Sequence, residues 1–306
     1  MKEERNVQLF RVGPCLFGTS SSIPDWKSEE LIPSLSHFLL SEKESLESKN
    51  KIIFSLNIKP EKDINEEDHS QYHQLVEFEW EGATCRISAM SGTDSYLITI
   101  LAPNDTKEYS ASFHSGFATG TLSLHATKAD AFVLNNILMM VYAFKTACID
   151  TVLMHASVIK KDGKGYLFLG KSGTGKSTHT QLWLENIPDC ELLNDDNPIV
   201  HFNKETGKAI VYGSPWSGKT PCYKNDSVLV GAFVRLEQAP ENIIKKEGAA
   251  RAFASLLSSC SCLKAAEKLN NGVIETVKLL AANLPVYHLK CLPDKAATEL
   301  SFNTIK

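Results

Sequence analysis

The segment GKSGTGKS at residues 170–177 constrains this chain more than any other feature of its sequence. It fits the phosphate-binding pattern G-x-x-x-x-G-K-[ST] at every specified position. The apolar run GYLFLG (165–170) precedes it, and a helical pattern follows it. Since this strand, loop and helix order is the context that the motif requires, we predict a P-loop rather than a chance glycine-rich turn.

The residue types of this loop suit a nucleoside triphosphate with Mg²⁺. Glycines let the backbone curl so that successive N–H groups point at phosphate oxygens, and the N-terminus of the following helix favours the same anion. Lys176 is expected to reach the β- and γ-phosphates, and the Ser177 hydroxyl to ligate magnesium. The predicted nucleotide-binding residues are Gly170, Ser172, Gly173, Thr174, Gly175, Lys176, Ser177 and Thr178.

Two adjacent acids follow the P-loop at the end of the apolar run LLNDD (192–196). A strand that ends in carboxylates is where the magnesium-binding acid of such a site belongs. Neighbouring residues of a strand point to opposite sides, so one acid is expected at the metal and the other at an acceptor proton or a water. A solvated Asp-Asp-Asn turn before Pro198 is the alternative.

The chain before residue 126 differs from the rest in its sequence pattern. Runs rich in β-branched and aromatic residues alternate with polar turns, which predicts a smaller, mainly antiparallel β domain over residues 1–125, of unknown role. The expected strands are 51–58, 75–80, 84–90 and 96–102.

Residues 126–306 predict an α/β domain that contains the P-loop. Helical patterns cover 128–147 and two segments near 247–259 and 265–283, while strands are expected at 150–161, 165–170, 190–196, 208–214, 227–237 and 284–291.

Composition limits the partners that we expect. The net charge is −4 and neither half of the chain is dominated by Lys and Arg, which argues against a nucleic-acid partner. The most apolar stretch, 131–147, is shorter than the roughly 20 apolar residues of a membrane span. Eight scattered cysteines and a first segment without an apolar run predict reduced thiols and a cytoplasmic protein.

Three features together resemble HPr kinase/phosphorylase, whose catalytic domain is related to nucleotide-dependent phosphoenolpyruvate carboxykinase. They are His155 in LMHASVI, the loop GKSGTGKST, and the double acid of LLNDD. The resemblance covers residues 150–200 and extends over 126–306. It implies a mixed-sheet P-loop core of that type and an ATP-dependent kinase.

The same resemblance implies roles for single residues. Lys176 would bind the phosphates, and Ser177 with Asp195 would hold Mg²⁺. Asp196 would act as the general base toward a hydroxyl, with His155 close enough to support the acid pair. The γ-phosphoryl group would pass to a seryl or other hydroxyl of a peptide, protein or small molecule, and the protein is expected to be a homo-oligomer.

Residues 212–225, YGSPWSGKTPCYKN, resemble a stretch of uncharacterised HPr-kinase-like proteins. Here Lys219 is a candidate cation for the transferring phosphate, and Trp216 a candidate stacking face; an ordinary Gly/Pro turn with a packed Trp is the alternative. Arg235 is a second candidate phosphate clamp, or else a surface ion pair.

Other functions remain open at this point. HPr kinase carries an acid where this chain has Thr178, so HPr itself is not the expected acceptor. A non-catalytic nucleotide-responsive module, a carboxykinase-like lyase and simple ATP hydrolysis are the alternatives to a kinase.

Overall fold

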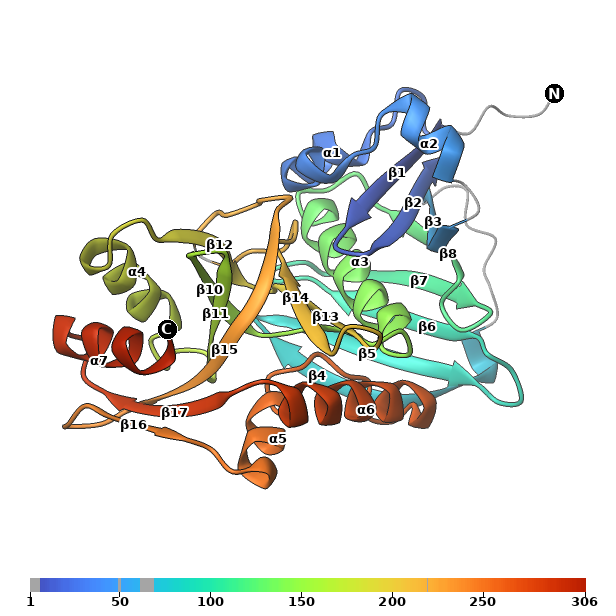
Figure 1. Ribbon diagram of the computed structural model, residues 1–306. Helices are drawn as coiled ribbons and strands as arrows, with labels where there is room; N and C mark the ends of the chain where they lie inside the picture. The colour runs from blue at the N-terminus through green and yellow to red at the C-terminus, as the bar shows by residue number, and fades with distance from the viewer. Residues whose placement is uncertain (1–5, 49–50, 61–68, 219) are drawn as a thin grey trace. The chain divides into compact units, whose positions relative to one another are not determined.

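The computed structural model describes residues 6–48, 51–60, 69–218 and 220–306 (Figure 1). The chain divides into two compact units. Unit 1 comprises Met1–Thr146 with Leu263–Glu267, and unit 2 comprises Ala147–Cys262 with Lys268–Lys306. Both units combine helices with a mixed sheet, so the protein is of mixed α/β type.

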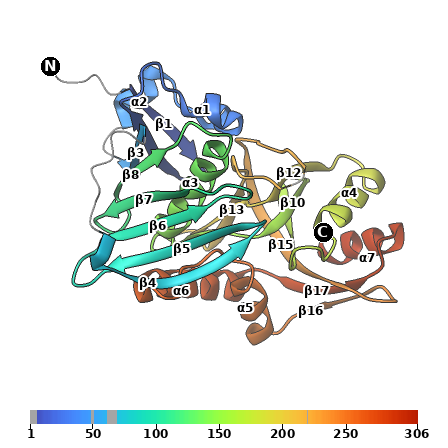
Figure 2. The same cartoon turned by 180° about the vertical axis from the view of Figure 1, so that it is seen from behind.

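Unit 1 is built on an eight-stranded sheet in the order β1-β2-β3-β8-β7-β6-β5-β4. Figure 2 shows its antiparallel run from β4 to β7. The strands are β1 (Asn6–Val12), β2 (Cys15–Ser21), β3 (Ile52–Pro60), β4 (Tyr72–Trp80), β5 (Ala83–Met90), β6 (Tyr96–Leu101), β7 (Glu108–His114) and β8 (Thr119–Leu124). Because β3 runs parallel to both β2 and β8, the sheet is mixed rather than antiparallel throughout.

Helix α3 (Asp130–Thr146) belongs to unit 1, although we expected the domain boundary at 125/126. The helix is apolar on most of its surface, and its Val133, Leu134 and Val141 are fully buried. Tyr142 also donates a hydrogen bond from its hydroxyl to the Val12 carbonyl at 2.6 Å. The division between the units therefore falls after Thr146. The other helices of unit 1 are α1 (Ser28–Leu31), α2 (Glu42–Ser48) and the 3-10 turns Pro33–Phe38 and His69–Gln71.

Unit 2 contains the P-loop and a second mixed sheet, in the order β12-β10-β11-β15-β14-β13-β9. Strand β17 pairs with β15, and β16 pairs with β17. The strands are β9 (Thr151–Leu153), β10 (Ala156–Lys161), β11 (Lys164–Leu169), β12 (Glu191–Asp196), β13 (Ile199–Asn203), β14 (Lys208–Tyr212), β15 (Ser227–Gln238), β16 (Ile243–Lys246) and β17 (Val286–Cys291). Strands β11, β15 and β17 are parallel neighbours.

Helices cover both faces of this sheet, which explains the hydrophobic run Tyr166–Leu169 of β11. Tyr166 and Phe168 pack in one buried cluster with residues of α4 (Lys176–Asn186) and α7 (Lys295–Ile305). Leu167 and Leu169 pack in a second cluster with residues of α5 (Ala249–Leu257) and α6 (Glu267–Asn283). Successive side chains point to opposite faces, so the four residues Tyr166–Leu169 that lie between the two clusters are all hydrophobic.

The expected strand over 150–161 is interrupted at Met154 and His155. Its first part, β9, pairs with β13, whereas its second part, β10, pairs with β11 and β12. The backbone N–H of His155 instead donates to the Ser259 carbonyl at 2.7 Å. The change of strand partners therefore places His155 at a break in the sheet.

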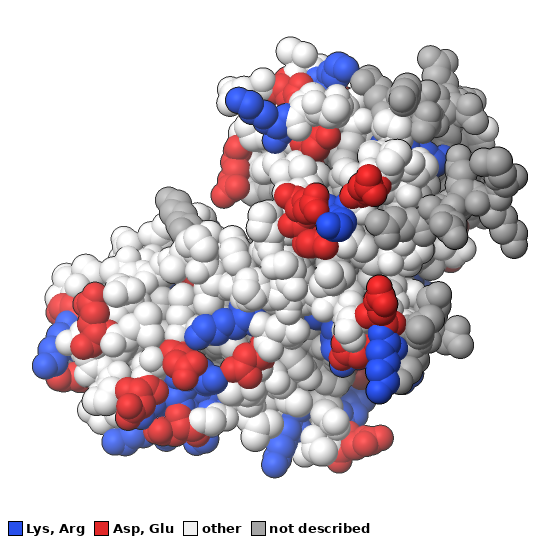
Figure 3. Space-filling model, turned by 90° about the horizontal axis from the view of Figure 1, so that it is seen from above, with Lys and Arg blue, Asp and Glu red and all other residues white. Residues whose placement is uncertain are grey.

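No helix in the described part of the chain is long and apolar enough to cross a membrane. On the face drawn in Figure 3, the described Lys and Arg side chains are interspersed with Asp and Glu. The expectation that no nucleic acid binds stays a prediction.

A buried histidine on α4 gives the fold a pH dependence that can be measured. His179 is 3% exposed, and its Nε2 accepts a hydrogen bond from Trp183 Nε1 at 3.2 Å. Burial lowers the pKa of His179 from 6.5 to about 4. Since the unfolded chain binds the proton first, stability should be complete above pH 6.5 and fall as pH drops toward 4, by on the order of 3 kcal/mol from this group.

Urea unfolding of the natural chain and of His179→Gln at several pH values between 7 and 4 tests this. The variant should lose less stability over that range, while the surface variant His114→Gln should follow the natural chain. Equal pH dependence of all three chains would contradict the prediction.

Candidate functional site

The P-loop connects β11 to α4 at the carboxyl end of a central strand. Gly173 and Gly175 have φ angles of 79° and 101°, a backbone region that L-residues with a Cβ rarely adopt. Gly175 is the N-cap of α4, whose first turn has free N–H groups for an anion. Ser172 and Thr178 are exposed, and the Gly170 and Thr174 positions flank the turn. The loop thus has the backbone form that phosphate binding needs.

Lys176 is held inside this loop by three acceptors. Its side chain lies 2.7 Å from His155 Nε2, 3.0 Å from the Gly170 carbonyl and 3.4 Å from the Lys171 carbonyl. The residue is 8% exposed. Burial lowers the pKa of the Lys176 ammonium, and the nearby carboxylates of Asp196 and Asp195 oppose that effect. A phosphate would offer this buried cation a better partner than neutral acceptors do.

His155 links Lys176 to Asp196. Its Nδ1 lies 2.7 Å from Asp196 Oδ1, on the other side of the ring from the lysine. The lysine can only donate, so Nε2 accepts from Lys176 and Nδ1–H donates to Asp196. The three side chains form one hydrogen-bonded series from the Lys176 ammonium to the Asp196 carboxylate.

Asp195 faces Ser177 instead. The Ser177 hydroxyl donates to Asp195 Oδ1 at 3.0 Å. Asp195 is 3% exposed, and its Oδ2 is a buried oxygen without a hydrogen-bond partner among the described residues. The two neighbouring acids therefore have different partners, as expected for adjacent residues of a strand.

These residues fit a magnesium-bound nucleotide. A buried carboxylate oxygen without a partner costs free energy, and a cation beside it would remove that cost. Mg²⁺ prefers oxygen ligands and is commonly held by one or two protein groups together with phosphates and water. Ser177 Oγ and the Asp195 carboxylate supply such ligands. Within the described ranges, no group of three or more His, Cys, Asp or Glu side chains is arranged around a common metal position.

Asp196 has a strained backbone. Its φ of 130° lies in a region that is essentially restricted to glycine, and such strain costs about 1–3 kcal/mol. Strain of this kind persists where the surroundings over-determine it, most often at functional sites. Here the His155 contact and a backbone bridge to Ser217 hold the residue.

Several supporting residues were not identified from the sequence. The fully buried Asn194 accepts from the Asn197 N–H at 3.0 Å and donates to Ser214 Oγ at 3.2 Å, which fixes the turn that carries the acids. The Ser217 hydroxyl donates to the Asp195 carbonyl at 3.0 Å. Gln238 Nε2 donates to the Gly173 carbonyl of the P-loop at 3.2 Å. No sequence pattern indicates these roles, which become visible only because the three residues contact the turn that carries the acids or contact the P-loop in the folded chain.

The remaining candidates have mixed outcomes. Trp216 is 2% exposed, so its ring is packed in the interior and the expected open stacking face is wrong. Lys219 lies outside the described residues. Among the described residues Arg235 has no ion-pair partner; its Nη1 donates to the Ser255 carbonyl at 3.3 Å and to Ser259 Oγ at 3.4 Å.

No protein-family model matches the chain, and no curated protein matches it at a significant level. The chemistry of the site therefore depends on the geometry above.

The strain at Asp196 predicts an unusual order of stability for two variants. Asp196→Gly and Asp196→Ala both remove the His155 contact, but only glycine relieves the backbone. We expect the glycine variant to be more stable than the alanine variant by about 1 kcal/mol or more in urea unfolding. At Glu191, on the same strand, the order should be the usual one, with alanine more stable by about 0.5–1 kcal/mol. If glycine is no better than alanine at residue 196, that position is not strained.

Proposed function

We propose that this protein is an ATP- and Mg²⁺-dependent phosphotransferase that moves the γ-phosphoryl group to a hydroxyl. The observation that carries the proposal is the joined series of Lys176, His155 and Asp196, with Asp195 beside Ser177. A P-loop alone would suit any nucleotide-binding protein. A carboxylate next to the phosphate-binding lysine suits proton removal from an acceptor.

In this proposal the phosphates take the place of His155 and the loop carbonyls as partners of Lys176. Bound Mg²⁺, held by Ser177 Oγ and Asp195, would screen the phosphate charge. Asp196 accepts the proton of the acceptor hydroxyl while the oxygen of that hydroxyl attacks the γ-phosphorus. The bond from that phosphorus to the β–γ bridging oxygen breaks, and ADP leaves. His155 orients the Asp196 carboxylate through Nδ1–H.

The acceptor class follows from the same site. A carboxylate that takes a proton from a neutral hydroxyl fits a seryl or similar alcohol of a peptide, protein or small molecule. An HPr-kinase-like relationship stays part of this proposal, as does assembly into a homo-oligomer.

Calorimetric titration with Mg²⁺·ATP, with γ-phosphate turnover followed in the same samples over a panel of seryl peptides and small alcohols, tests the proposal. Lys176→Ala should weaken ATP binding by about 100-fold, because it removes a charge-assisted contact. Asp196→Asn should bind ATP within about threefold of the natural chain and lose about 10²–10⁴ in turnover.

Lys161→Ala and Asp226→Asn are matched controls, since both residues form surface ion pairs away from the loop. Full turnover by Asp196→Asn would exclude this residue as the base. ATP binding without turnover for any acceptor would favour a nucleotide-responsive module instead.

A further inference from the structure

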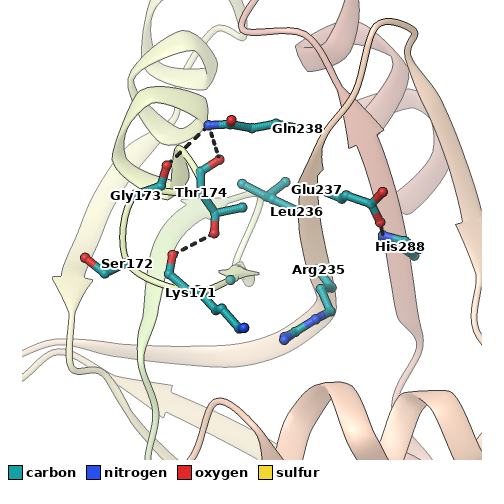
Figure 4. A pocket seen from close by; sticks show the side chains of 10 residues that line it. Lys171, Ser172, Gly173, Thr174, Arg235, Leu236, Glu237, Gln238 and His288 are labelled. Carbon is teal, nitrogen blue, oxygen red and sulfur yellow. Dashed lines mark hydrogen bonds and ion pairs between the residues drawn. The ribbon is translucent and has the colours of Figure 1, made fainter.

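A pocket of about 440 Å³ lies beside the P-loop, at the end of the sheet where β11 and β15 finish (Figure 4). Its volume is within the range of small-molecule sites, about 300–1,000 Å³. One wall is the loop itself. The other is formed by the end of β15 and by β17, with Arg235, Leu236, Glu237, Gln238 and His288.

The pocket and the acid pair flank the P-loop on opposite sides. Strand β11 pairs with β10 along one edge and with β15 along the other. His155 precedes β10, and the two acids end β12, which is the next strand beyond β10. The carboxyl ends of β11, β15 and β17 meet at one edge of the sheet, which is where ligands of α/β proteins bind.

This arrangement fixes the direction of a phosphoryl transfer. The attacking and leaving oxygens are roughly in line through the transferred phosphorus. If Asp196 receives the proton of the acceptor, the acceptor lies on the acid side of the loop. The leaving nucleotide then extends toward the opposite side, where the pocket lies.

We propose that this pocket receives the ribose and base of the nucleotide whose phosphates occupy the P-loop. The inference depends on the proposed function, since it takes Asp196 as the general base.

The chemistry of the lining fits a nucleotide. Figure 4 shows the side chains of Lys171 and Arg235 pointing toward one another at one end of the pocket. Arg235 Nη1 donates to the neutral oxygens of Ser255 and Ser259, and an anion between Lys171 and Arg235 would give both cations a charged partner. The phosphate end of a nucleotide supplies that charge.

The rest of the pocket fits the uncharged part of the ligand. Leu236, which is 5% exposed, extends from β15 toward Thr174 and closes the pocket with an apolar side chain. Glu237, which accepts from His288 Nε2 at 2.8 Å, stands at the far wall and can accept from a ribose hydroxyl. Gln238, bonded to the Gly173 carbonyl, joins this wall to the loop.

Comparison of ATP with inorganic tripolyphosphate, both with Mg²⁺, tests the pocket by calorimetry. The double variant Glu237→Ala/His288→Ala removes the wall that faces away from the loop. We expect its ATP dissociation constant to rise about tenfold, while that for tripolyphosphate changes less than about twofold. Lys176→Ala should weaken both ligands.

Glu191→Ala is the matched control, because Glu191 also accepts from two cations at a similarly exposed position outside the pocket. It should leave both constants unchanged, and thermal unfolding checks that the double variant is folded. An equal loss for both ligands, or no loss for either, would overturn the nucleoside pocket and leave the kinase proposal intact. If the natural chain binds neither ligand, the P-loop function itself is wrong, and the pocket proposal fails with it.

Discussion

The burial of β11 on both faces is the constraint on which the rest of unit 2 depends. Its side chains belong alternately to the cluster with α4 and α7 and to the cluster with α5 and α6. A one-residue change of register would move every side chain of this strand from one packed cluster into the other and disrupt both. The loop that follows the carboxyl end of β11 therefore starts from a fixed strand, and Lys176 at the start of α4 has a fixed position.

Two charged groups of the site are buried with incomplete partners, which costs stability. Lys176 is buried on neutral acceptors, and one carboxylate oxygen of Asp195 has no partner in the described chain. A magnesium-bound phosphate ligand would remove both free-energy costs. Its phosphates would contact Lys176, and its cation would contact the Asp195 carboxylate. Lys176 and Asp195 are thus the residues that would gain most from contact with a magnesium-bound phosphate.

Asp196 shows the same relation between function and stability in the backbone. Glycine would suit its φ angle better, yet glycine has no carboxylate for His155. The neighbouring turn compensates through a buried hydrogen bond of Asn194 and a partly buried hydrogen bond of Ser217. A chain selected for stability alone would not keep an acid at this position.

The sequence by itself determined the elements whose signals are local. The P-loop is eight consecutive residues, and the apolar pattern places strands at β11, β12 and β15 close to their observed bounds. Strands β1, β2, β7, β8, β13 and β16 and helix α7 were not predicted, and α3 was assigned to the wrong side of the domain boundary, because packing partners far along the chain decide these features.

Only the tertiary structure decided which side chains meet. Lys176 and His155 are 21 positions apart in the sequence, yet their side chains are in contact. Gln238 contacts the Gly173 carbonyl across a separation of 65 positions. The resemblance suggested that His155 lies near the acids, but not that it connects Asp196 to Lys176. Local sequence fixes the conformation that a segment prefers. The contacts between segments depend on strand pairing and on the burial of apolar side chains, and both involve all segments of the chain together.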